Sequence, residues 1–88
     1  MKKTKSIILI SGNGSNLSNI IKNVNSGYID MEISMVISNN PDAKGLIIAS
    51  ENKLPTLVLD TSQGFDNKLS EIIEKNSIGL VVLAGFMK

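Results

Sequence analysis

The sequence predicts an α/β fold built on an open parallel sheet, and two observations carry this prediction. Apolar residues make up 42% of the 88 residues but aromatic residues only 3%, so the core must be built from Ile, Leu and Val, as in helices packed on a buried parallel sheet. The apolar pattern also alternates between short continuous runs and helical spacing, which is typical of βαβ units. With no repeat or linker, residues 1–88 form one domain.

The first strand and helix are the clearest elements. Residues 6–10 are a serine followed by four apolar residues, which predicts a strand, and a glycine-containing turn follows it. The next apolar residues recur at i, i+3, i+4 and i+7, one stripe of a helix: Leu17, Ile20, Ile21 and Val24. Gly27 is placed to end that helix in a left-handed conformation.

The middle of the chain predicts a second strand over residues 33–37 and a helix after it. Asn40, Pro41 and Asp42 suit a cap, a first helical position and an acid near the positive end of the helix. We expect the inner face of this helix to continue through three further residues: Leu46, Ile47 and Ser50.

Two more strands enclose the third helix. Pro55 blocks further helix, so residues 56–59 are a short third strand and residues 60–64 a loop. The stripe of the third helix is Phe65, Leu69, Ile72 and Ile73, and its solvated face is Glu71, Glu74 and Lys75. Residues 80–84 are five apolar residues in a row, which predicts a fourth strand covered on both faces.

Three right-handed crossovers between four parallel strands favour the order 3-2-1-4, a Rossmann-like arrangement. The chain reverses direction between strands 1 and 4, and ligands of open α/β sheets bind at the carboxyl ends of the strands beside such a reversal. Here those ends carry residues 12–16 and 85–88. We therefore expect any ligand site at these two segments.

Composition excludes several classes of partner. Net charge is +1, and three of the nine lysines lie in the first five residues, so no basic face remains for nucleic acid. The first apolar run is shorter than a signal peptide requires, and no stretch approaches the ~20 apolar residues of a membrane span. Without cysteine, disulfides, thiol catalysis and cysteine metal sites are absent. Without a membrane span or disulfides, we expect a cytoplasmic protein. No pair of acids has metal-binding spacing, so we expect no metal site.

The glycine loop is the candidate binding site. Its amides lie where a helix begins, and unpaired N–H groups and the helix dipole attract anions there. The segment suits a phosphate monoester, with Ser and Asn side chains as extra donors; it comprises Gly12, Asn13, Gly14, Ser15 and Asn16. A plain helix cap would use the same residue types, so this alternative stays open.

Two other phosphate motifs fit less well. A Walker loop needs Gly-Lys-Ser/Thr at its end, whereas Ser15 and Asn16 follow Gly14. A dinucleotide fingerprint needs a third glycine where Leu17 stands and an acid after the second strand, where residues 38–40 are Ser-Asn-Asn. Nicotinamide nucleotides are therefore a minor alternative.

The run over residues 8–17, Ile-Leu-Ile-Ser-Gly-Asn-Gly-Ser-Asn-Leu, closely resembles the opening of phosphoribosylglycinamide formyltransferases, folate-dependent enzymes of purine synthesis. Further segments agree in order: Ile20-Ile21, Ser38-Asn39, Asp42-Ala43, Gly45-Leu46 and residues 81–87. The resemblance covers essentially this whole chain but only the first half of the family's. It implies an incomplete formyltransferase fold.

The resemblance also implies ligands. It assigns Gly14, Ser15 and Asn16 to the phosphate of phosphoribosylglycinamide, and Met87, followed by Lys88, to the side of the cosubstrate 10-formyltetrahydrofolate. Lys88 stands where the family usually has arginine, and the loop over residues 60–67 is shorter than in the family. The resemblance places the catalytic Asn, His and Asp in the second half, and this chain contains no histidine.

We therefore expect a formyltransferase chain that keeps the substrate phosphate loop and shows no transferase activity by itself. Two alternatives remain from the sequence: a module that works with a separately encoded second half, and a nucleotide- or phosphate-binding α/β domain outside the family. A strand missing beside the fourth strand would expose an apolar edge, through which we expect self-association.

Overall fold

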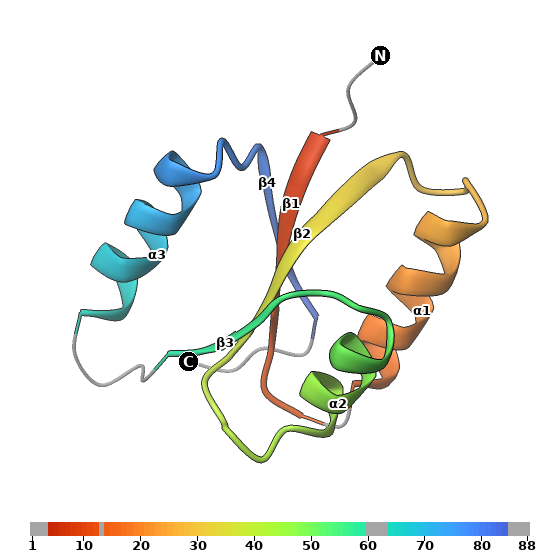
Figure 1. Cartoon of the computed structure of the whole chain (residues 1–88), viewed down its shortest axis with the longest axis horizontal. Helices are drawn as coiled ribbons and strands as arrows, with labels where there is room; N and C mark the ends of the chain where they lie inside the picture. Colours follow the sequence, from red (N-terminus) through yellow and green to blue (C-terminus); the bar gives the residue numbers. More distant parts are fainter. Residues whose placement is uncertain (1–3, 13, 60–63, 85–88) are drawn as a thin grey trace.

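A computed structural model describes residues 4–12, 14–59 and 64–84. Its strands are parallel neighbours in the order β3-β2-β1-β4, so the predicted topology is confirmed (Figure 1). The elements are β1 (Thr4–Ile10), α1 (Ser15–Asn25), β2 (Met31–Ser38), α2 (Lys44–Glu51), β3 (Thr56–Val58), α3 (Phe65–Lys75) and β4 (Leu80–Leu83). No helix in these ranges is of the length and apolarity that crossing a bilayer demands.

The central strand β1 organises the sheet. Ile8 lies between Val36 of β2 and Val82 of β4. Both β1 and β2 begin two residues before the predicted starts, because ladder pairing continues to Thr4 and Met31 beyond the apolar runs. The carboxyl ends of the strands consequently gather at one edge of the sheet.

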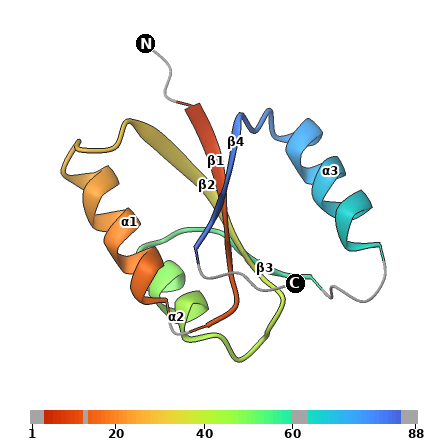
Figure 2. The ribbon, with the colours of Figure 1, turned by 180° about the vertical axis from the view of Figure 1, so that it is seen from behind.

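The helices form two layers around the sheet. Figures 1 and 2 show α1 and α2 together on one face and α3 alone on the other. Successive side chains of β1 alternate between them, as in any strand: Ile8 and Ile10 belong to the cluster under α1 and α2, and Ile7 and Leu9 to the cluster under α3. The chain therefore builds two separate half-cores.

Helices α1 and α3 agree with their predicted stripes. Leu17 and Ile21 are buried on α1, and Phe65 is buried on α3. The remaining stripe residues pack partly buried against the same two clusters: Ile20, Val24, Leu69, Ile72 and Ile73. Gly27 ends α1 in the left-handed region at φ 84°, as predicted.

The predicted start of α2 is wrong. The helix begins at Lys44 with Ala43 as its N-cap, and Asn40 and Asp42 precede it. The Asn40 Oδ1 accepts a hydrogen bond from the Asp42 amide at 3.0 Å, and the Asn40 amide donates to Ser38 Oγ at 3.0 Å. An Asn side chain can accept a hydrogen bond from the backbone two residues further on. These local bonds therefore hold residues 40–42 in a turn that precedes the helix, where the sequence predicted the helix itself to begin.

The predicted inner face of α2 is wrong at two of its three residues. Gly45 and Ala49 are its buried residues, whereas Ile47 is 61% exposed and Ser50 is exposed. Leu46 is partly buried against the core under α1 and α2. The helix presents its smallest side chains to its neighbours, which brings its backbone close to the glycine loop.

The fourth strand is less covered than predicted. Leu80 is 45% and Leu83 64% exposed, and among the described strands β4 pairs with β1 alone. The strand ends at Leu83, but the Ala84 amide still donates to the Leu9 carbonyl at 2.9 Å. Among the described strands, an apolar strand thus forms one edge of the sheet, and an apolar edge at the fourth strand was expected.

Candidate functional site

The glycine loop joins β1 to α1 at the carboxyl edge of the sheet. Gly14 is buried, while Gly12, Ser15 and Asn16 are exposed. Asn13, also predicted to bind substrate, lies outside the described residues. The described members of the predicted site are therefore together on one short segment, with Ser15 and Asn16 in the first turn of α1.

The start of α1 has the electrostatic character of an anion site. Its N-cap is Gly14, which contributes no side-chain hydrogen bond, and the first turn contains no acid. The first helical bond runs from the Ser18 amide to the Gly14 carbonyl at 2.9 Å. Glycine is itself a favoured N-cap residue, so the alternative of a plain helix cap stays open, and no carboxylate within the first turn offsets the helix dipole.

Gly14 is a glycine for two reasons. Its φ of 85° is in the left-handed region that L side chains rarely adopt. A Cβ there would also lie 2.6 Å from the Gly45 Cα and 2.9 Å from Ile48 Cδ1. The close approach of this glycine is therefore to α2, a contact that the sequence analysis did not predict.

Gly12 differs from Gly14 in both respects. A Cβ built on Gly12 would meet no atom within 4 Å, and its φ is outside the left-handed region. The fold itself does not require a glycine at this position. A side chain at this position would project into the open space beside the loop.

A second loop completes one side of the site. A cavity of about 210 Å³ separates the end of β1 from the loop between β2 and α2. It is lined by Ser11, Gly12, Asn40, Asp42, Ala43 and Lys44. Asn40 and Asp42 were predicted to start a helix, and their place beside the glycine loop was not predicted. The available signal was the predicted strand order, since strands 1 and 2 are neighbours.

The other predicted ligand segment, residues 85–88, lies outside the described residues, which end at Ala84. The bond from Ala84 to Leu9 brings the end of β4 beside the end of β1, where the reversal of chain direction was predicted. Met87 and Lys88, predicted to border the folate, lie outside the described residues, as does most of the loop that begins at Asp60. In the described ranges no three His, Asp or Glu side chains gather as a metal site would need.

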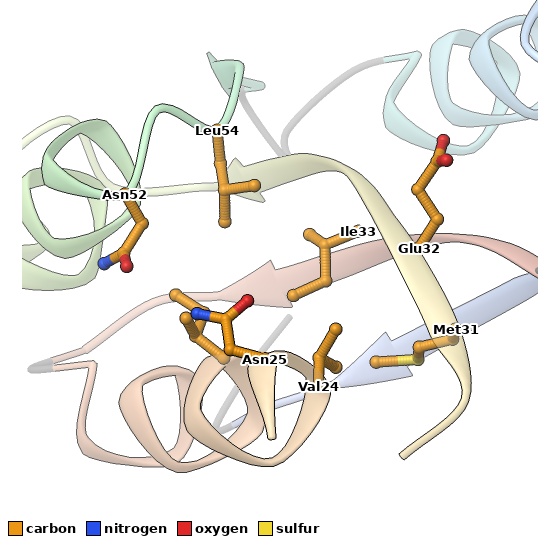
Figure 3. Close-up of a pocket in the computed structure, with 8 residues that line it drawn as sticks. Val24, Asn25, Met31, Glu32, Ile33, Asn52 and Leu54 are labelled. Carbon is orange, nitrogen blue, oxygen red and sulfur yellow. The ribbon is translucent and has the colours of Figure 1, made fainter. Parts of the chain in front are cut away.

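A larger cavity lies at the opposite edge of the sheet. It has a volume of about 240 Å³ and is lined by Ile21, Val24, Asn25, Met31, Glu32, Ile33, Asn52 and Leu54. Figure 3 shows apolar side chains on its walls and the Glu32 carboxylate pointing away from them. Because these residues stand where β2 begins and where α1 and α2 end, the cavity is remote from the glycine loop.

Comparison with known proteins decides the family. The model of the family described as "Formyl transferase" matches residues 4–88. The chain belongs to this formyl transferase family. It is 37% identical over 89 residues to a phosphoribosylglycinamide formyltransferase of Haemophilus influenzae, in an alignment that covers 96% of this chain and 42% of the relative.

Solved formyltransferase structures give the same result. A phosphoribosylglycinamide formyltransferase from Anaplasma phagocytophilum is 38% identical with a TM-score of 0.88, over 99% of this chain and 42% of that one. A glycinamide ribonucleotide transformylase from Symbiobacterium toebii is 33% identical with a TM-score of 0.89, over 98% and 43%. This formyltransferase chain thus spans less than half the length of these relatives, and the alternative of a domain outside the family is wrong.

Proposed function

We propose that this chain provides the part of a phosphoribosylglycinamide formyltransferase that binds the phosphate of phosphoribosylglycinamide. The observation that carries the proposal is the glycine loop at the start of α1, on the sheet edge where ligands of open α/β sheets bind. The relatives named above support the choice of substrate.

The phosphate is assigned to Gly14, Ser15 and Asn16, and Gly12 and Asn13 stay predicted substrate-binding residues. Backbone amides at a helix start, the helix dipole and exposed Ser and Asn side chains together suit a group with several acceptor oxygens. Asp42 lines the neighbouring cavity and would repel a dianion. The phosphate is therefore placed against α1, away from the loop that carries Asp42.

The reaction itself requires groups that this sequence lacks. In the proposed reaction the glycinamide amine bonds to the formyl carbon, the bond from that carbon to the folate nitrogen breaks, and a proton moves from the amine to that nitrogen. The resemblance assigns this proton transfer to Asn, His and Asp, and these 88 residues contain no histidine. Lost acid–base catalysis typically costs about 10²- to 10⁴-fold, so we expect no measurable turnover from these residues alone.

The cosubstrate of the proposed reaction is 10-formyltetrahydrofolate, with Met87 and Lys88 on its side of the site. Both residues stay predictions from the family resemblance. A second half supplied by another polypeptide is compatible with this proposal, because the phosphate loop and the catalytic groups would then meet only in the complex.

Binding of phosphoribosylglycinamide to the whole chain tests the proposal. Following Ser15 and Asn16 amide signals by NMR, we expect saturable shifts in the wild type and none in Gly12→Val. The new side chain meets no atom of the fold at its Cβ, so the variant should stay folded. Ser18→Ala, one turn further along α1, is the matched control that should bind normally. Binding by Gly12→Val at wild-type strength, or no binding by a folded wild type, would contradict the proposal.

The edge of β4 is proposed as a contact between two copies of this chain. Leu80–Leu83 contains no charged residue, and two of its four side chains are strongly exposed; such unprotected edges pair readily. Val82 packs on the side of α1 and α2 and Val81 on the side of α3. A two-fold axis perpendicular to the sheet would keep the α3 faces of the two copies on the same side, which favours antiparallel pairing of the two β4 strands.

Sedimentation over a wide concentration range tests this contact. We expect reversible dimers for the wild type and monomers for Leu83→Lys, because a charge on an edge strand opposes pairing. Ile47→Lys is the control, since Ile47 is similarly exposed but lies on α2. A monomeric wild type, or equal effects of the two lysines, would refute the β4 contact.

A further inference from the structure

We propose that Gly45, the second residue of α2, is a positioning residue that holds the glycine loop in its phosphate-binding shape. This inference rests on the proposed function and deepens it. The sequence offers no reason to place Gly45 at the site, since it follows the glycine loop by about thirty residues and belongs to another helix.

The backbone does not explain a glycine at this position. Gly45 is helical, buried and outside the left-handed region, and a glycine inside a helix is less favourable than alanine. Its small size is therefore used for packing. A Cβ on Gly45 would collide with Ile10 Cδ1 and would lie 3.3 Å from the Gly14 Cα.

Gly45 contacts the loop at two points. A Cβ on Gly14 would in turn lie 2.6 Å from the Gly45 Cα, so each glycine leaves room for the other. The Gly45 amide also donates to the Gly12 carbonyl at 3.4 Å. Because this bond is longer than a typical N–H···O bond of 2.7 to 3.2 Å, the steric contact at Gly14 is the stronger constraint.

The two contacts leave one side of the loop open. Gly14 is clamped against α2, whereas Gly12 turns its missing side chain toward open space. Gly14 is also the N-cap of α1, so any shift of Gly14 moves the first-turn amides at Ser15 and Asn16. Gly45 thereby sets the position of donors that it does not touch.

A double variant separates this role from core packing. Ile10→Val removes Cδ1, the atom that an alanine at position 45 would strike, so Ile10→Val/Gly45→Ala retains only the tight contact with Gly14. We expect this variant to unfold in urea close to Ile10→Val but to bind inorganic phosphate about 5- to 10-fold more weakly, because small misplacements at a site are costly. Ile10→Val alone should bind like the wild type.

The readout is the set of Ser15 and Asn16 amide signals during titration with inorganic phosphate. Equal dissociation constants, within about twofold, for Ile10→Val and the double variant would overturn the positioning role. If the folded wild type binds no phosphate, the proposed function fails. In that case the amide signals of Ser15 and Asn16 are compared without ligand. A shift of these signals in the double variant relative to Ile10→Val supports positioning by Gly45, and unchanged signals reject it.

Discussion

The two faces of the sheet differ in how many residues are buried beneath their helices. Among the described residues, the buried cluster under α1 and α2 has eight members and includes side chains from both helices, whereas the cluster under α3 has five and Phe65 is the only buried residue of that helix. Leu80 and Leu83 are exposed along the neighbouring edge. One helix cannot cover the area that two helices cover on the other face.

This difference coincides with the position of the candidate site. The glycine loop, Gly45 and the cavity lined by Lys44 all belong to the face with two helices. Backbone donors at a binding site must be held in place, and the close approach of Gly14 to Gly45 of α2 restricts the glycine loop. Among the described residues, fewer residues of α3 than of α1 and α2 are buried.

The largest expected effect compares two helix N-caps. Gly14 and Gly64 have nearly the same left-handed backbone, but a Cβ on Gly14 strikes α2 and one on Gly64 meets nothing within 4 Å. Backbone strain and overpacking together should make Gly14→Ala cost about 2–5 kcal/mol of unfolding free energy. Gly64→Ala carries the backbone part alone, about 1–2 kcal/mol. Urea unfolding followed by circular dichroism measures both, and equal losses would show that the contact with Gly45 is unimportant.

A contrast of similar size is expected between two leucines, one on each face. Leu17 on α1 is fully buried and Leu69 on α3 only partly. Leu17→Ala should cost about 2–5 kcal/mol because it leaves a cavity, and Leu69→Ala roughly 1 kcal/mol because its apolar area is already partly hydrated. Unfolding midpoints at a constant denaturant slope measure the difference. A larger loss for Leu69→Ala would reverse the comparison between the faces.

The smallest effect concerns local opening in the wild type. We expect amides of α3 to exchange with solvent roughly tenfold faster than those of α1, because local stability follows buried apolar contact. Native-state hydrogen exchange at low denaturant measures this. Exchange of both helices only through global unfolding, with identical free energies, would indicate a single cooperative core instead.

Part of this molecule could be predicted from local patterns. The stripes of α1 and α3, the left-handed Gly27 and the order of strands were predicted correctly, because each depends on residue spacing, backbone sterics or the handedness of crossovers. The glycine loop was placed correctly at the sheet edge for the same reason. Its ligand stays a prediction.

Other predictions failed where side-chain hydrogen bonds or packing against another element override helix propensity. Asn40 and Pro41 form a good helix start on propensity, yet hydrogen bonds to Ser38 and Asp42 hold a turn there. Ile47 has the character of a core residue but is exposed, because α2 packs through Gly45 and Ala49. Neither outcome can be read from the residue types alone.

The sequence by itself thus determined the fold class, the strand order and the location of the candidate phosphate loop, since periodicity and chain sterics act over a few residues. Only the tertiary structure decided where α2 begins, which of its faces is buried, why Gly14 and Gly45 are both small, and that Asp42 and Lys44 face the loop. The first is set by side-chain hydrogen bonds within residues 38–42, and the other three by contacts between segments that the sheet brings together and the chain keeps far apart.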